Sequence, residues 1–128
     1  MSSEALAQFA NQKYLSLESY RKSGVAVAVP VWFAEDDGRL YIYSLADAGK
    51  VKRIRNNARV RIAPCDVRGR VIGDWVDARA RIVEGSEAAH GMDLLTRKYG
   101  LVKKVFDLLH KLRRGKRAVI AIEPDGEK

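Results

Sequence analysis

The first half of the chain alternates polar and apolar residues with the period of two that is typical of β-strands. The alternation covers Tyr14–Tyr20, Val25–Phe33 and Arg39–Leu45, and turn signals at Arg21–Gly24 and Asp36–Gly38 separate these segments. Connections this short cannot hold a crossover helix. The pattern therefore predicts an antiparallel meander of three strands and disfavours a Rossmann fold.

The second half mixes further strand patterns with helical ones. Further strands are predicted at Arg59–Pro64, Val76–Val83 and Arg117–Glu123. Helices are predicted at Ser3–Gln12 (with Ser3 as its cap), Lys50–Asn56, Glu87–Tyr99 (ended by Gly100) and Leu101–Arg114. About six or seven antiparallel strands with a few short helices favour a closed or partly closed barrel, because closure removes exposed strand edges. We expect one mainly β domain over residues 1–128.

Composition excludes several classes of protein. The 128 residues are 47% hydrophobic and 31% charged, which is typical of a chain with a packed core rather than a disordered one. The single cysteine, Cys65, excludes an internal disulfide, and His90 and His110 are too far apart in sequence to suggest a metal site. No secretory leader and no apolar run of about 20 residues is seen, so a cytoplasmic protein without a membrane anchor is expected.

The chain also lacks an obvious set of catalytic side chains. There is no GxSxG sequence, no evident Ser/His/Asp set, and no histidine near Cys65 in sequence, so that thiol reads as a strand residue. If the protein is an enzyme, we expect a bound cofactor to supply the chemistry.

Positive charge is concentrated in one segment. The chain has 24 basic and 16 acidic residues, and Lys50–Arg61 contains six basic residues and no acidic one. Asp47–Lys50 brings a turn, a predicted helix start and lysine together, so free N–H groups and ammonium groups are expected to converge in a way that suits a phosphate. The P-loop spacing is absent. A solvated basic face is the alternative interpretation.

Two other segments have unusual faces. In Val25–Phe33 the odd positions are bulky, whereas the even positions are mostly small and would form a flat face. Such a face admits a planar ligand or a second subunit, or it packs under a helix. The basic, amphipathic segment Leu101–Arg114 could lie on a membrane, but packing of its apolar side against the barrel is the commoner use.

Several motifs together resemble a known family, the flavin/deazaflavin split β-barrel proteins of the pyridoxamine 5'-phosphate oxidase-like superfamily, in their F420-dependent oxidoreductase branch. The resemblance runs from about Tyr14 to Pro124. The motifs are Val-Pro-Val-Trp-Phe (29–33), Leu-Tyr-Ile-Tyr (40–43), Gly-Lys-Val-Lys-Arg-Ile-Arg-Asn-Asn (49–57), Arg-Val-Arg-Ile-Ala-Pro-Cys-Asp (59–66), Arg-Lys-Tyr-Gly (97–100) and Leu-Arg-Arg-Gly (112–115).

The resemblance implies a six-stranded antiparallel split β-barrel that forms a homodimer, with F420 or FMN in two grooves between the subunits. It implies a ring beside the strand that carries Pro30 to Trp32, and a phosphate held by the loop and helix from Ser44 to Arg53. We expect Trp32, with Trp75 as a second candidate, to line the ring or substrate pocket. The implied cofactor-binding residues are Val29, Pro30, Val31 and Trp32 for the ring, and Ser44, Lys50, Val51, Lys52 and Arg53 for the phosphate or tail. No catalytic side chain is indicated.

The function that the resemblance implies is hydride transfer between the bound F420 or FMN and a small conjugated substrate. Val29 and Ala48 stand where the family often has a hydroxyl residue, so a cofactor-storage or vestigial flavin-binding protein is one alternative. A nucleic-acid-binding module that uses Lys50–Arg61 is another, although aromatic residues are not interleaved with these basic ones.

Overall fold

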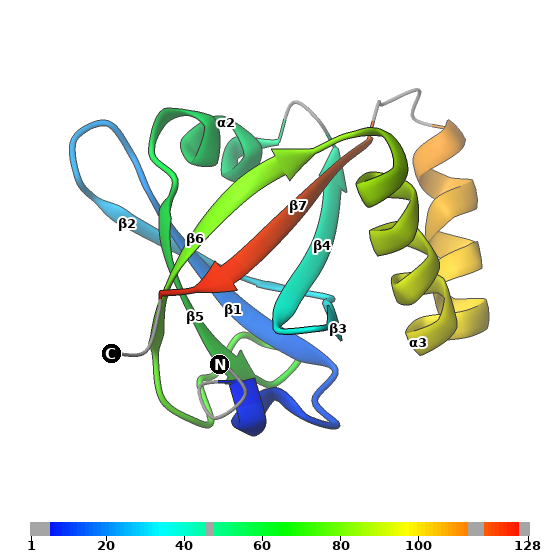
Figure 1. Cartoon of the computed structure of the whole chain (residues 1–128), viewed down its shortest axis with the longest axis horizontal. Helices are drawn as coiled ribbons and strands as arrows, with labels where there is room; N and C mark the ends of the chain where they lie inside the picture. Colours follow the sequence, from blue (N-terminus) through cyan, green and yellow to red (C-terminus); the bar gives the residue numbers. More distant parts are fainter. Residues whose placement is uncertain (1–5, 46–47, 113–116, 126–128) are drawn as a thin grey trace.

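The computed structural model describes residues 6–45, 48–112 and 117–125, with the backbone alone described for residues 45 and 101–112. Seven strands and two α-helices follow a single turn of 3₁₀-helix (Figure 1). In chain order the elements are η1 (Ala7–Phe9), β1 (Tyr14–Tyr20), β2 (Ala26–Val31), β3 (Ala34–Asp36), β4 (Arg39–Leu45), α2 (Gly49–Asn56), β5 (Arg59–Cys65), β6 (Val76–Val83), α3 (Gly85–Leu112) and β7 (Arg117–Pro124).

All seven strands form one antiparallel sheet in the order β2-β1-β5-β6-β7-β4-β3. The two edge strands, β2 and β3, are neighbours in the chain and are joined by only Trp32 and Phe33. Because two residues cannot span an open sheet, the sheet curls until its edges approach at this point (Figure 1). The mainly β split barrel is confirmed, with one more strand than the six expected.

The predicted meander is wrong in one respect. β2 does not pair with β4, because the chain leaves β2, forms the short strand β3 at the opposite edge and then turns into β4. Phe33 is 1% exposed and packs edge-on against Phe9, at 5.9 Å between ring centroids. Burial of this ring bends the chain out of β2. The Asp37–Gly38 turn, with positive φ at both residues, then joins β3 to β4.

The two ends of the barrel are filled by different elements. Val51 and Ile54 of α2 enter the core at one end, and Leu6 and Phe9 beside η1 enter at the other (Figure 1). Of the predicted N-terminal helix, the described residues show a helical Leu6 and the 3₁₀ turn Ala7–Phe9, and Asn11 follows with a φ of 64°. The proposed cap Ser3 lies outside the described residues.

Helix α3 covers the outer face of β4 and β7. Ala88 and Met92 pack against Tyr41 and Val119 there. Gly100, as predicted, interrupts the helical conformation with φ 57° and ψ −127°, which suits glycine. The backbone is helical again from 101 to 112; the side chains predicted to form its apolar stripe, and the last residues of that prediction, are outside the described set. Among the described residues, no helix is long and apolar enough to cross a membrane.

Candidate functional site

Helix α2 carries two basic side chains that lie near its start, Lys50 in the first turn and Arg53 in the second. Val51 and Ile54 anchor one side of this helix in the core, so Lys50 and Arg53, three residues apart, share another side. The Arg53 guanidinium folds back over Gly49, where an added Cβ would lie 2.8 Å from a terminal nitrogen of Arg53. Glycine at 49 therefore lets the guanidinium lie against the start of the helix.

Arg53 is fixed by a bond to β1. Its Nε donates to the hydroxyl of Ser19 over 2.7 Å, and Ser19 is fully buried. Burial, and then the nearby charge of Arg21, lower the pKa of Arg53. The sequence analysis named Arg53 but did not identify Ser19 as its hydrogen-bond partner. The available signal was that Ser19 occupies the core-facing position that follows Leu15 and Leu17 in the β1 alternation.

Lys50 is half-buried beside Arg53, and its environment is costly for a positive charge. Burial first, and then the charge of Arg53, lower the pKa of the Lys50 ammonium. Within the described part of the chain, neither Lys50 nor Arg53 forms an ion pair with a carboxylate. An anion placed between them would relieve both the burial cost and the mutual repulsion.

The other residues assigned to the phosphate are placed differently. Lys52 is exposed and, two residues from Lys50, lies on a different side of the helix. Val51 is fully buried, so only its backbone could face a ligand, and its N–H already donates to the Ala48 carbonyl. Ala48 caps α2 without a side-chain bond. Asp47, predicted to shape this turn, lies outside the described residues.

Ser44 lies near the end of β4, shortly before the loop that leads into α2. It is 7% exposed, and its hydroxyl forms no hydrogen bond with any side chain or backbone group in the described ranges. A buried hydroxyl normally has a partner. Among the described residues, the Ser44 hydroxyl is therefore a donor that a ligand could use.

Strand β2 presents the two faces that its sequence predicts. Val27, Val29 and Val31 are half-buried on the core side, whereas Ala26, Ala28 and Pro30 are exposed on the outer side. β2 is also an edge strand. Its outer face is exposed at Ala26, Ala28 and Pro30, and the loop at Gly69 approaches it only beside Pro30.

An aromatic cleft follows the end of β2. Trp32 stacks on Tyr99 of α3, with ring centroids 4.6 Å apart and planes 12° from parallel. The hydroxyl of Tyr99 is 2.7 Å from the Lys13 carbonyl and 2.9 Å from that of Phe33, and it accepts the N–H of Phe33 at 3.0 Å. Trp32 and Tyr99 line a cavity of about 210 Å³ with Lys13, Tyr14 and Lys98. Tyr99 and Lys98 belong to one of the motifs of the family resemblance, but the sequence analysis gave neither of them a role in the site.

The basic pair and the aromatic cleft lie at opposite ends of β2. Ser19, the partner of Arg53, is the cross-strand neighbour of Val27, and Trp32 follows the last residue of the strand. The five residue-to-residue steps from Val27 to Trp32 span about 16 Å of extended chain. A molecule with an anionic end and a planar end, joined by an extended linker, fits this layout.

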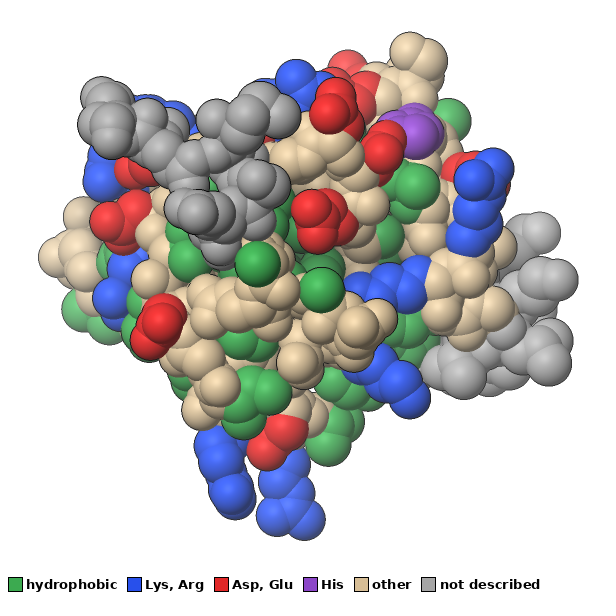
Figure 2. Space-filling model, turned by 60° about the horizontal axis from the view of Figure 1, so that its bottom comes forward, with side chains coloured by type: hydrophobic (Ala, Val, Ile, Leu, Met, Phe, Trp, Pro, Cys, Tyr) green, Lys and Arg blue, Asp and Glu red, His purple; other side chains and the backbone are tan. Residues whose placement is uncertain are grey.

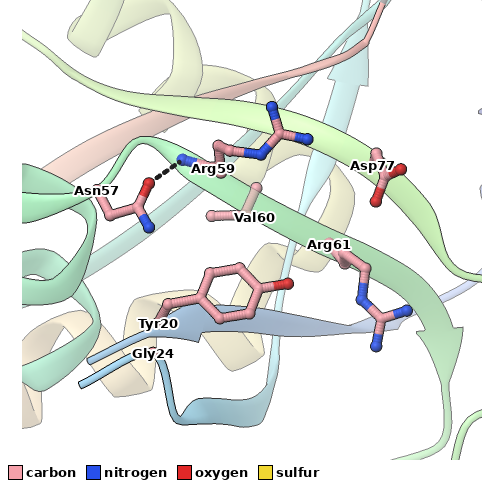
Figure 3. Close-up of a pocket in the computed structure, with 7 residues that line it drawn as sticks. All are labelled: Tyr20, Gly24, Asn57, Arg59, Val60, Arg61 and Asp77. Carbon is pink, nitrogen blue, oxygen red and sulfur yellow. Dashed lines mark hydrogen bonds between the residues drawn. The ribbon is translucent and has the colours of Figure 1, made fainter. Parts of the chain in front are cut away.

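A second hollow, of about 280 Å³, lies outside the barrel over β1, β5 and β6 (Figure 3). It contains Arg59 and Arg61 of the basic run, but both are paired. Arg61 forms two bonds to the buried Glu18, at 2.6 and 3.1 Å, and Arg59 lies 3.8 Å from Asp125. The Arg61 guanidinium also covers Trp75, so that tryptophan is not in the cleft with Trp32.

The surroundings of Cys65 and His90 do not indicate a catalytic role. Cys65 is buried, and burial raises the pKa of its thiol to about 11. His90 is exposed and lies 2.6 Å from Asp36. In the described ranges no three His, Cys, Asp or Glu side chains are grouped to hold a metal ion.

Comparisons with known proteins identify the fold. The structure resembles that of HutZ, the heme storage protein of Vibrio cholerae, with a TM-score of 0.74 and 15% identity over 97% of this chain and 89% of that one. It resembles a FAD-binding protein from Mesorhizobium loti, with a TM-score of 0.64 and 18% identity over 98% of this chain and 89% of that one. It also resembles an F420 reductase, with a TM-score of 0.61 and 18% identity over 94% of this chain and 93% of that one.

The sequence itself carries the family signature. No curated protein matches it. The family model described as pyridoxamine 5'-phosphate oxidase, however, matches residues 1–127, nearly the full length. The chain therefore belongs to the pyridoxamine 5'-phosphate oxidase family of split-barrel proteins.

Proposed function

We propose that the protein binds F420 or FMN along β2 and acts as an oxidoreductase on a small conjugated substrate. The observation that carries this proposal is the pairing of Lys50 and Arg53 at the start of α2, without a carboxylate partner in the described residues. The F420 reductase and FAD-binding protein among the structural neighbours add support.

The residues present fit the phosphate of such a cofactor. Lys50 supplies an ammonium group, Arg53 a guanidinium already oriented by Ser19, and Ser44 a hydroxyl. The start of α2 adds the positive end of its dipole. Lys52 contributes charge at longer range, because its side chain lies on another side of the helix.

The outer face of β2 fits a planar ring. Ala28 and Pro30 place little bulk above the strand, so a ring can approach its backbone closely, and Trp32 offers an aromatic surface at the end. When bound, a flavin or deazaflavin supplies or accepts a hydride, with the proton balance completed by water. The protein's part is to hold the phosphate, orient the ring and exclude water.

A homodimer is part of this proposal. The outer face of β2 is apolar, open and at the sheet edge, so a second copy of the chain would cover it and complete a groove. Light scattering at micromolar concentration should give twice the mass of one 14.3 kDa chain. A monomer would contradict the shared groove.

The ion pairs of Arg59 and Arg61 weaken the alternative that the protein binds nucleic acid. Arg59 and Arg61 are neutralised by Asp125 and Glu18, so the basic run does not present a continuous row of free cations. On the face seen in Figure 2, basic side chains lie mostly around the rim, with acidic and hydrophobic ones between them. No specific observation favours that function.

Absorption and fluorescence titrations with purified F420 and FMN test the proposal. Saturable binding of one of them with about one site per chain is expected, and Trp32 fluorescence should be quenched as the ring binds. If neither cofactor binds, the proposal is contradicted, and a vestigial barrel becomes the better interpretation.

A further inference from the structure

The aromatic cleft contains two lysines that the cofactor proposal does not use. Lys13 and Lys98 line it together with Tyr14, Trp32 and Tyr99. Neither lysine forms an ion pair with a carboxylate in the parts of the chain that the structure describes. Two cations therefore flank a cavity whose other walls are aromatic.

Lys98 is held inside this cleft by an aromatic contact. Its Nζ lies 3.6 Å from the ring centroid of Phe33 and 5.4 Å from that of Tyr99. Phe33 is buried and so holds its ring in place under the ammonium, while Lys98 itself is exposed to solvent on its other side. Burial lowers the pKa of Lys98 to about 8, and Glu35 opposes this only in part. A negatively charged ligand would stabilise the charged amine more effectively than the ring does.

The walls of the cleft are fixed before any ligand arrives. The Tyr99 hydroxyl is held by three backbone groups of Lys13 and Phe33, and burial raises its pKa to about 12, so it stays neutral. The stacked pair of Trp32 and Tyr99 offers an aromatic surface that favours another flat ring. The cavity of about 210 Å³ admits a molecule with one small ring.

We propose that this cleft binds a planar organic carboxylate, with its conjugated part against Trp32 and Tyr99 and its carboxylate at Lys98 and Lys13. The cleft continues from the end of β2, where the cofactor ring is proposed to lie. The carboxylate is therefore proposed as the class of substrate, and this role, unlike the binding itself, rests on the proposed function. A neutral conjugated molecule lacks the group that the two lysines select.

The test uses the cofactor-free protein and a matched pair of probes. These are trans-cinnamate and its neutral counterpart, cinnamyl alcohol. The chain has two tryptophans, and Trp75 lies under Arg61 outside the cleft, so the two indole N–H signals in a nitrogen-15 spectrum provide a target and an internal reference. A Trp75→Phe variant assigns them. Cinnamate should shift the Trp32 signal saturably, and should bind about tenfold more tightly than the alcohol.

Three variants and the pH dependence isolate Lys98. Lys98→Met keeps an unbranched apolar side chain on Phe33 and should weaken cinnamate binding about tenfold, while Lys98→Arg should retain it. Lys22→Met, at the exposed β1–β2 turn, is the control and should change nothing. Affinity should fall as pH rises through about 8 and beyond, and this fall should disappear in Lys98→Met. Lys13, Tyr14, Tyr99 and Glu35 are the other titratable groups that face Lys98.

The outcomes separate this inference from the cofactor proposal. Equal affinity for acid and alcohol, or no shift of the Trp32 signal at millimolar cinnamate, would overturn the carboxylate site even if F420 or FMN binds. Cinnamate binding without binding of either cofactor would retain the site and overturn its role as a substrate pocket.

Discussion

The side chains of Arg53 and Ser19 join helix α2 to strand β1 through a bond of 2.7 Å from Nε to the buried hydroxyl. The bond occupies one edge of the guanidinium. Its two terminal nitrogens remain over the first turn of the helix, beside Lys50. Ser19 is therefore a positioning residue for the proposed phosphate site, and Arg53 is the group that would touch the phosphate.

Replacing Ser19 by alanine should have both a structural and a ligand-specific effect. The free energy of unfolding should fall by about 1 kcal/mol, because Arg53 loses a buried hydrogen-bond partner. FMN affinity should also fall, whereas riboflavin affinity should hold. Urea denaturation and fluorescence titration measure the two effects, with Ser86→Ala on the exposed surface of α3 as control. A variant as stable as the parent would show that the bond does not fix Arg53.

The pairing of Glu18 with Arg61 predicts a dependence of stability on pH. The hydrogen bonds from Arg61 are the largest cause that lowers the pKa of Glu18 below its ordinary 4.5, and burial opposes them. A carboxylate with a lowered pKa stabilises the fold above about pH 4.5 and loses that contribution as pH falls further. Glu18→Gln should therefore cost about 2 kcal/mol at pH 7 and progressively less below pH 4.5.

Urea denaturation across this pH range measures the effect of Glu18→Gln. Glu84→Gln, at an exposed position, serves as the matched control. A destabilisation by Glu18→Gln that is equal at pH 7 and pH 3 would mean that packing rather than charge accounts for the loss.

Cys65 should be inert in the native protein. Its side chain is 2% exposed, and burial raises the thiol pKa to about 11, so the reactive thiolate is scarce below that pH. Ellman's reagent at pH 8 should react only as fast as the protein opens, and urea should make the reaction complete at once. Rapid modification without denaturant would contradict the buried placement.

The regular strands could be predicted from sequence, whereas the joins between distant segments could not. β1, β4 and β6 have the predicted bounds, because alternation defines each of them locally, and the Asp37–Gly38 turn sets the start of β4. β3 has no alternation of its own and exists through pairing with β4. Its neighbour Phe33 bonds to Tyr99, 66 residues away, a contact that no local pattern encodes.

The candidate site likewise contains residues that sequence motifs could indicate and residues that only tertiary contacts bring together. The motifs placed Trp32 directly after a strand, and Lys50 and Arg53 on a short helix, as the structure does. They grouped Lys52 with Lys50 because the two are close in sequence, although the helical period separates their side chains. Ser19 and Lys98 were missed, because each joins its part of the site only through tertiary packing.

The most direct measurement is the affinity of FMN and of riboflavin for the parent protein and for Lys50→Ala and Lys52→Ala. The phosphate should contribute about 2 kcal/mol or more in the parent. Lys50→Ala should remove most of that difference and leave riboflavin binding unchanged, while Lys52→Ala should have a much smaller effect. Equal losses for the two ligands, or equal affinity of the two ligands for the parent protein, would contradict a phosphate site at the start of α2.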